Sequence, residues 1–93
     1  MKQFVRVLSD VDCTWTGKPP VYRVYVDDEL FAERTWKWKN EYLEELLQIE
    51  AEPGEYVITY ELLDPTSATL HVNNMRVDHG PGRVNNNMLR ITK

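Results

Sequence analysis

Alternation of apolar and polar residues with a period of two is the feature that most constrains the fold of this chain. In VYRVYVD, the side chains of Tyr22, Val24 and Val26 fall on one face of an extended chain, and the intervening ones fall on the other. β-Branched and aromatic residues dominate this segment, and Pro19 and Pro20 prevent a helix from running into it. The segment is therefore predicted to be a strand with one buried face.

The next segment, LFAERTW, resumes the extended pattern after an acidic DDE stretch. A two-residue loop between the two strands would set Arg23 against Arg34, and like charges directly opposite each other are unfavourable. A three-residue loop instead places Arg23 beside Glu33 and Val24 opposite Ala32. We therefore predict a hairpin with a three-residue loop.

The segment NEYLEELLQIEAEPGEYVITYELLDP supports two interpretations. Its first half is rich in Leu, Glu and Gln, which favour a helix, and Asn40 is suited to cap one. A turn on the Pro-Gly dipeptide instead gives a hairpin in which Ile49 lies opposite Ile58 and Leu47 opposite Tyr60.

That register places the apolar residues on one face and, apart from Val57, polar residues on the other, as in an antiparallel pair of a sandwich. We predict the hairpin, with a helix at 41–48 as the alternative.

The last third of the chain is predicted to form short strands separated by turns. Asn73 and Asn74 tolerate left-handed conformations and indicate a tight turn or a bulge. Two glycines, a proline and three asparagines predict a loop over 79–87, and a second long loop is expected over 10–20.

Strands at FVRVL near the start and MLRIT at the end complete a set of about eight short strands, spaced by roughly ten residues. The predicted fold is all-β: a single-domain antiparallel β-sandwich over residues 1–93, jelly-roll-like in its architecture.

Composition and charge narrow the range of partners. The 93 residues are 42% hydrophobic and 28% charged, which predicts a folded domain rather than a disordered tail. Residues 41–64 hold eight acidic side chains and no Lys or Arg. Such a segment repels phosphate and argues against nucleic acid as a partner. We expect these carboxylates to line a solvent-exposed face, with a docking surface for a basic partner as the alternative.

A single cysteine, Cys13, excludes an internal disulfide framework and a zinc site built on paired cysteines. We expect it to be a packed free thiol. No apolar stretch is long enough to cross a bilayer, and the short apolar run at the start contains a charge, unlike a secretory signal. Neither a signal peptide nor a transmembrane segment is predicted, and no membrane partner is expected.

No catalytic motif is found. No serine or cysteine lies in a nucleophile elbow, and the GPG tripeptide lacks the neighbours of a phosphate-binding loop. The chain is therefore not expected to be an enzyme. His71 alternates with apolar residues and is predicted to be solvated, whereas His79 lies in the glycine loop beside Asp78 and is a candidate binding residue. No metal ligand set is predicted.

The three tryptophans are the remaining candidates for a binding surface. Trp36 and Trp38 lie two apart and face the same way on an extended chain, so they form either a flat platform for a sugar or base, or a cap on the core. The core interpretation is favoured because they continue the face of Val24. Trp15, in a CTWTG loop, is the better candidate for a partly exposed aromatic side chain.

At PPVYRVYVDDELFAERTWKW, followed by YLEELLQIEAEPGEYVITYEL, the sequence resembles small proteins of unassigned function that are encoded by tailed phages of marine cyanobacteria. The resemblance covers residues 19–63, and VYVDDELFAERTW is its most specific part. It implies a phage-encoded protein and supplies no catalytic residues.

The order of the strands, the VDDEL turn, the PG hairpin and LHVNNMRVDHG is more remotely similar to calcium-dependent, xylan-binding-type carbohydrate modules, which are jelly-roll sandwiches. That similarity implies calcium and a glycan as ligands. The residues that correspond to the calcium ligands would be Asp78, Asn85 and Asn86.

Together these observations predict a non-enzymatic, phage-encoded β-sandwich that works through contacts with a phage or host protein, in the virion or in the host cytoplasm. The alternative is a carbohydrate-binding module, with or without calcium. A homo-oligomer is also expected, because strands at the edges of a sheet need covering and a short chain buries little surface.

Overall fold

The computed structural model describes residues 1–38 and 41–92, and in these ranges the chain forms eight β-strands and no helix. The predicted all-β fold is confirmed. The strands are β1 (Gln3–Trp15), β2 (Val21–Val26), β3 (Glu29–Thr35), β4 (Tyr42–Ala51), β5 (Gly54–Leu62), β6 (Ala68–His79), β7 (Gly82–Asn85) and β8 (Met88–Ile91).

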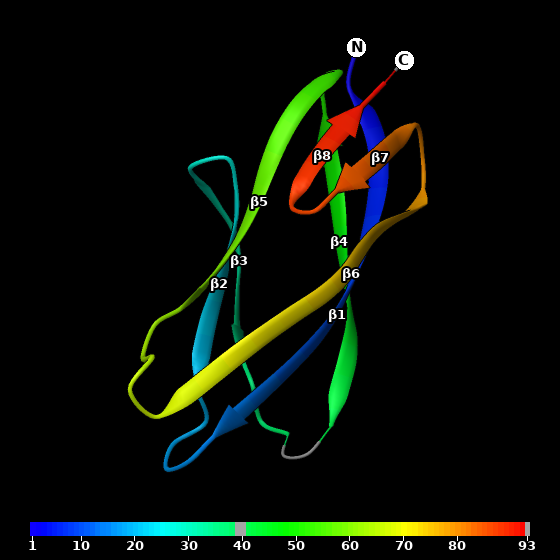
Figure 1. Ribbon diagram of the computed structural model, residues 1–93. Coiled ribbons are helices and arrows are strands. Elements are labelled where there is room, and N and C mark those ends of the chain that lie inside the picture. The colour runs from blue at the N-terminus through cyan, green and yellow to red at the C-terminus, as the bar shows by residue number, and fades with distance from the viewer. Residues whose placement is uncertain (39–40, 93) are drawn as a thin grey trace.

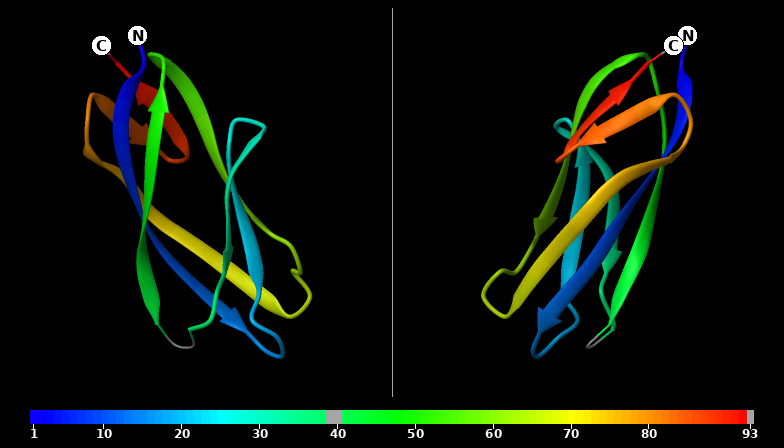
Figure 2. Two further views of the ribbon diagram at one scale, coloured as in Figure 1. Left: turned by 180° about the vertical axis from the view of Figure 1, so that it is seen from behind. Right: turned by 45° about the vertical axis from the view of Figure 1, so that its right-hand side comes forward.

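Two antiparallel sheets pack face to face (Figures 1 and 2). The first has the order β4-β1-β6 and the second the order β3-β2-β5-β8-β7. β6 is therefore an edge strand, and β7 and β8 form a short hairpin that lies beside one end of β5 only (Figure 1).

The hairpin of β2 and β3 has the predicted pairing over most of its length. Arg23 lies opposite Glu33, with 2.8 Å between Nε and Oε1, and Val24 lies opposite Ala32. Beyond Val24 the register shifts by one residue, so the loop is shorter than predicted and Phe31 is left unpaired with β2. A positive φ of 56° at Asp27 closes the turn, which fits the tolerance of Asp for this conformation.

The predicted hairpin over 47–60 is wrong in its pairing. β4 pairs with β1 and β5 pairs with β2 and β8, so the Pro-Gly dipeptide carries the chain from one sheet to the other. The predicted faces are nevertheless correct: Leu47, Ile49 and Ile58 are buried in the core. The helix at 41–48 does not form over 42–48, and Asn40, which would cap it, lies outside the described residues.

Two other segments differ from expectation. Much of the expected loop over 10–20 belongs to β1, which runs to Trp15. The expected loop over 79–87 contains β7 and is not irregular throughout. In both cases the sheet supplies hydrogen-bond partners that local turn propensity does not reveal.

Of the two alternatives expected at Asn73 and Asn74, a tight turn or a bulge, the bulge is confirmed. It lies within the continuous strand β6, with φ of 54° at Asn74.

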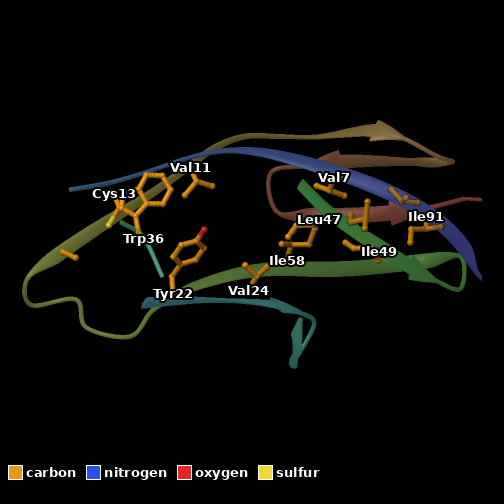
Figure 3. Close-up of a cluster of buried hydrophobic side chains, with 13 residues drawn as sticks. Val7, Val11, Cys13, Tyr22, Val24, Trp36, Leu47, Ile49, Ile58 and Ile91 are labelled. Carbon is orange, nitrogen blue, oxygen red and sulfur yellow. The ribbon is translucent and has the colours of Figure 1, made fainter. Parts of the chain in front are cut away.

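The core lies between the sheets, with Trp36 and Tyr22 toward one end and Ile49 and Ile91 toward the other (Figure 3). Cys13 is a buried free thiol in this cluster, as predicted. Its burial raises the pKa of the thiol. In the described ranges, no helix of the length and apolarity needed to cross a membrane occurs.

Candidate binding cleft

A cleft of about 960 Å³ opens between β5 of one sheet and β6 of the other. None of the described residues that line it is charged. Apolar side chains of the two strands, including Ile58, Tyr60, Leu70 and Val72, form its walls. The cleft is therefore an opening of the sandwich interior toward solvent.

The cleft exists because the β7–β8 hairpin is short. β8 pairs with β5 only from Gly54 to Val57, and the Ile58 amide then donates to the carbonyl oxygen of Asn87 at 2.8 Å. Beyond Ile58 no described strand continues on that side of β5. One edge of the second half of β5 is therefore open.

The hydrogen bonds at either end of this segment show which main-chain groups point to the open edge. The Leu63 amide donates to the Val21 carbonyl oxygen, and the Val57 carbonyl oxygen accepts from the Asp27 amide. The main-chain groups of Val57 and Leu63 therefore point toward β2. In an antiparallel ladder the direction alternates from residue to residue. The N–H and C=O groups of Tyr60 and Leu62 therefore point into the cleft, and no described residue bonds to them.

The facing edge of β6 is open in the same way. The Thr16 amide donates to the Ser67 carbonyl oxygen, and the pairing of β1 with β6 continues from there without a shift as far as Val72. Alternation then directs the main-chain groups of Ala68, Leu70 and Val72 away from β1. Two open strand edges thus border one cleft.

Loops close the cleft at both ends. At the lower end in Figure 1, β5 and β6 are joined through a turn in which Asp64 Oδ1 accepts from the Thr66 amide and hydroxyl. These bonds lower the pKa of the Asp64 carboxyl. At the other end, Asn74 of the β6 bulge and the turn formed by Asn86 and Asn87 line the cleft.

A polar cluster lies inside the sandwich next to the cleft. Glu45 of β4 faces the core, 8% exposed, and its Oε2 accepts from the Tyr22 hydroxyl at 2.8 Å and from Arg34 Nε at 3.0 Å. The prediction that all acids of 41–64 line a solvent face is therefore wrong for Glu45. This carboxylate is tolerated because Arg34 and Tyr22 both donate to it.

Tyr60 connects this cluster with the cleft, because its ring stacks on that of Tyr22 with 5.9 Å between centroids. Burial raises the pKa of both tyrosines, and the nearby Glu45 carboxylate raises it further. The hydroxyls of Ser9 and Tyr60 and Glu45 Oε1 are buried together in this cluster. The cluster therefore places polar atoms inside the sandwich beside the cleft.

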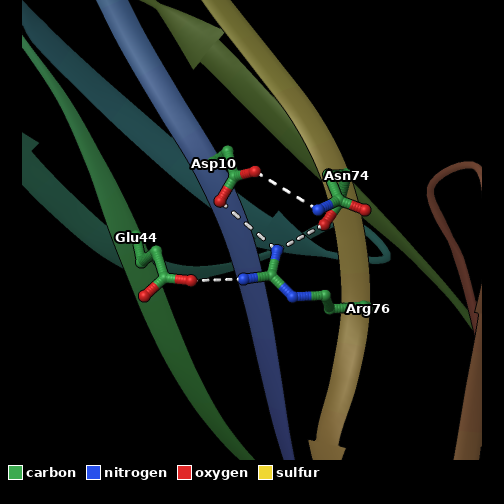
Figure 4. A network of polar contacts seen from close by, with 4 residues as sticks. All are labelled: Asp10, Glu44, Asn74 and Arg76. Atoms are coloured by element: carbon green, nitrogen blue, oxygen red, sulfur yellow. Dashed lines mark hydrogen bonds and ion pairs between the residues drawn. The ribbon is translucent and has the colours of Figure 1, made fainter.

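A second polar network crosses the outer face of the three-stranded sheet (Figure 4). Arg76 of β6 bonds to Asp10 of β1 at 3.3 Å, to Glu44 of β4, and to the carbonyl oxygen of Asn74 at 2.8 Å. These contacts tie the three strands together across the bulge. Because the groups are paired with one another, this network is best explained by its role in the fold.

The three tryptophans gather at one end of the molecule. Trp36 is buried in the core, as predicted, whereas the same prediction is wrong for Trp38, which is 40% exposed. The two rings meet edge to face, with an interplanar angle of 72°. The two rings therefore do not form a flat platform. Trp15 ends β1 and is not in a loop, and its Nε1 donates to the Trp38 carbonyl oxygen at 2.7 Å. None of the three lines the cleft.

The other candidate residues lie on β6, on β7 and in the turn between β7 and β8. His71 is exposed, as expected, and His79 is exposed beside the Phe4 ring, 6.3 Å between centroids. Asp78 forms an ion pair with Arg6 at 2.8 Å. Asn86 lines the cleft, whereas Asn85 and Asp78 do not. No group of three or more His, Cys, Asp or Glu within the described residues is arranged to hold a metal ion.

The cleft residues were not predicted as a site. Alternation assigns Ile58 and Tyr60 to the core, and it predicts correctly which face of the strand they lie on. Alternation does not predict whether another strand covers the edge of β5. The signal that could have revealed the cleft is the shortness of the last two strands relative to β5. No protein-family model, curated protein or solved structure matches this chain.

Proposed function

We propose that the protein is a non-enzymatic β-sandwich that binds another protein through the cleft between β5 and β6. The observation that carries the proposal is the pair of open strand edges bordering an uncharged cleft. Unpaired main-chain groups beside apolar side chains are typical of surfaces that a partner covers.

The resemblance of residues 19–63 to small cyanophage proteins supports a phage setting, with a phage or host protein as the partner. Two variants follow: a virion component, or a protein that acts in the cytoplasm of the infected host. Mass spectrometry of purified virions separates them. Detection at a stoichiometric level supports the virion variant, and absence from the particles contradicts it.

Selection of short peptides from a random display library tests binding of a polypeptide by the cleft. Leu70→Arg places a charge in the cleft, and His71→Arg places the same side chain on the outer face of the same strand. Peptides enriched on the wild type should be retained by His71→Arg and lost by Leu70→Arg, provided that both variants keep the native circular dichroism spectrum.

A glycan is the second candidate ligand, because amide side chains are suited to sugar hydroxyls and four asparagines line the cleft: Asn73, Asn74, Asn86 and Asn87. A glycan array with and without calcium tests this alternative. Glycan binding together with no enriched peptide would overturn the protein-binding proposal in favour of the carbohydrate module.

A further inference from the structure

The open segment of β5 is a slot of defined length. From Ile58 to Leu62 a strand spans about 16 Å at roughly 3.3 Å per residue, which accommodates about five residues of another strand. The Asn87 carbonyl oxygen already accepts from the Ile58 amide and marks one end of the slot. The turn after β5 marks the other.

The main chain of the slot offers the groups that an added strand requires. The N–H and C=O groups of Tyr60 and Leu62 point to the open edge of β5. Both neighbours of β5 in the sheet, β2 and β8, are antiparallel to it. A segment bound antiparallel would therefore continue the ladder already formed by β8.

The side chains of β5 define the pattern of that segment. Residues directly opposite each other in an antiparallel pair share a face. Residues opposite Tyr60 and Leu62 would point into the cleft, toward its apolar wall on β6, and those opposite Thr59 and Glu61 would point to the outer face of the sheet. The expected segment alternates apolar and polar side chains.

The outer face beside the slot is acidic. A small groove of about 220 Å³ there is lined by Asp27, Asp28 and Glu61, together with Tyr25 and Thr59. Thr59 belongs to the cleft as well, so the groove adjoins it. A basic residue at the outward position of the bound segment would meet this charge.

The edge of β5 is a better template than that of β6. β5 pairs with β2 without a register shift, whereas β6 carries a bulge at Asn74, and bulges twist an edge away from further pairing. Opposite the slot, β6 instead forms the wall against which the apolar side chains would pack.

On the basis of the function proposed above, we propose that β5 binds an extended segment of the partner protein that runs antiparallel to it. Apolar side chains of the segment point into the cleft, and Lys or Arg between them lies beside Glu61. The partner is thus recognised as a strand, by its main chain as well as by its side chains.

The probe is a capped peptide of about seven residues in which Val alternates with Lys, compared with a Val–Glu peptide. N-Methylation of the valines removes the donors that face β5, whereas N-methylation of the lysines removes donors that face away. We expect methylated valines to weaken binding by at least about tenfold and methylated lysines to have little effect. The Val–Lys peptide should bind more tightly than the Val–Glu peptide, and Glu61→Gln should reduce that difference.

Amide hydrogen exchange locates the bound peptide, and the Tyr60 and Leu62 amides should become protected when the Val–Lys peptide is added. Binding that is equally sensitive to both methylation patterns, or that leaves these amides unprotected, would overturn strand addition while leaving protein binding by the cleft intact. Binding of neither peptide at about millimolar concentration would also overturn it, even if library peptides bind elsewhere in the cleft. Protection that grows with protein concentration and no peptide would show a second copy in the slot and contradict a separate partner.

Discussion

Gly80 illustrates how a single residue fixes the end of β6 against β1. Its φ is +100°, and a Cβ placed on it would lie 2.3 Å from the carbonyl oxygen of Phe4. Gly17 also has a positive φ, +80°, but a Cβ there would meet no atom within 4 Å. Substitution of either glycine by alanine would therefore strain the backbone, but only the substitution at Gly80 would also cause a steric clash.

We predict that Gly17→Ala lowers the free energy of unfolding by about 1 kcal/mol and that Gly80→Ala lowers it by about 2 kcal/mol more. Urea denaturation of both variants measures the difference. Equal losses would mean that the chain near Phe4 does not approach Gly80 as described.

The buried tyrosines should make the free energy of unfolding decrease at alkaline pH. Burial raises the pKa of Tyr22 and Tyr60 in the folded protein, so their contribution is complete below the unfolded pKa of about 10 and is lost as the pH rises above it. The urea midpoint of the wild type should therefore fall between about pH 9 and about pH 11, and Tyr60→Phe should reduce this fall. Tyr42→Phe, at a side chain that is 65% exposed, is the control and should leave the fall unchanged. A fall of the same size in Tyr60→Phe would contradict the assignment.

At the scale of elements, alternation along β5 determines which side chains enter the core. Ile58 is 1% exposed, whereas its neighbour Thr59 is exposed. We predict that Ile58→Ala lowers the free energy of unfolding by about 2–4 kcal/mol and Thr59→Ala by less than about 1 kcal/mol. Chemical denaturation measures both, and equal costs would indicate a strand shifted by one residue.

The sequence predicted the faces of the strands better than their neighbours. The face of β5 follows from its own residues, and the β2–β3 pairing follows from a short loop and the Arg23–Glu33 pair. The partners of β4 do not follow, because a Pro-Gly turn is compatible with a hairpin and with a crossing between sheets. The same period of two buries Ile49 in either arrangement.

At the scale of the whole molecule, the candidate site arises from a strand that is too short. The end of β8 at Met88 lies opposite Val57, whereas β5 continues to Leu62. The cleft appears beside this uncovered part of β5. No motif marks such a place, because its apolar walls consist of residues that also pack in the core. The tryptophans and His79 were better candidates by residue type, yet none of them lines the cleft.

Self-association is a further expectation for a short chain with open edges. The acidic outer face of β4, or that of β5 in the other sheet, would meet the basic C-terminal third of another copy. Salt would weaken that contact because the Debye length is about 8–10 Å near physiological ionic strength. Sedimentation at low and high salt should show a dimer that dissociates as salt is added. A monomer in both conditions, at about tens of micromolar, would end this hypothesis.

The central claim is that one edge of β5 is open beyond Ile58, and amide hydrogen exchange of the free protein, read by NMR, tests it most directly. Thr59 and Glu61 point toward β2, and their amides should exchange slowly. The Tyr60 and Leu62 amides, which point into the cleft, should exchange much faster. An alternation of slow and fast exchange along these four residues is the predicted result, and uniformly slow exchange would contradict an open edge.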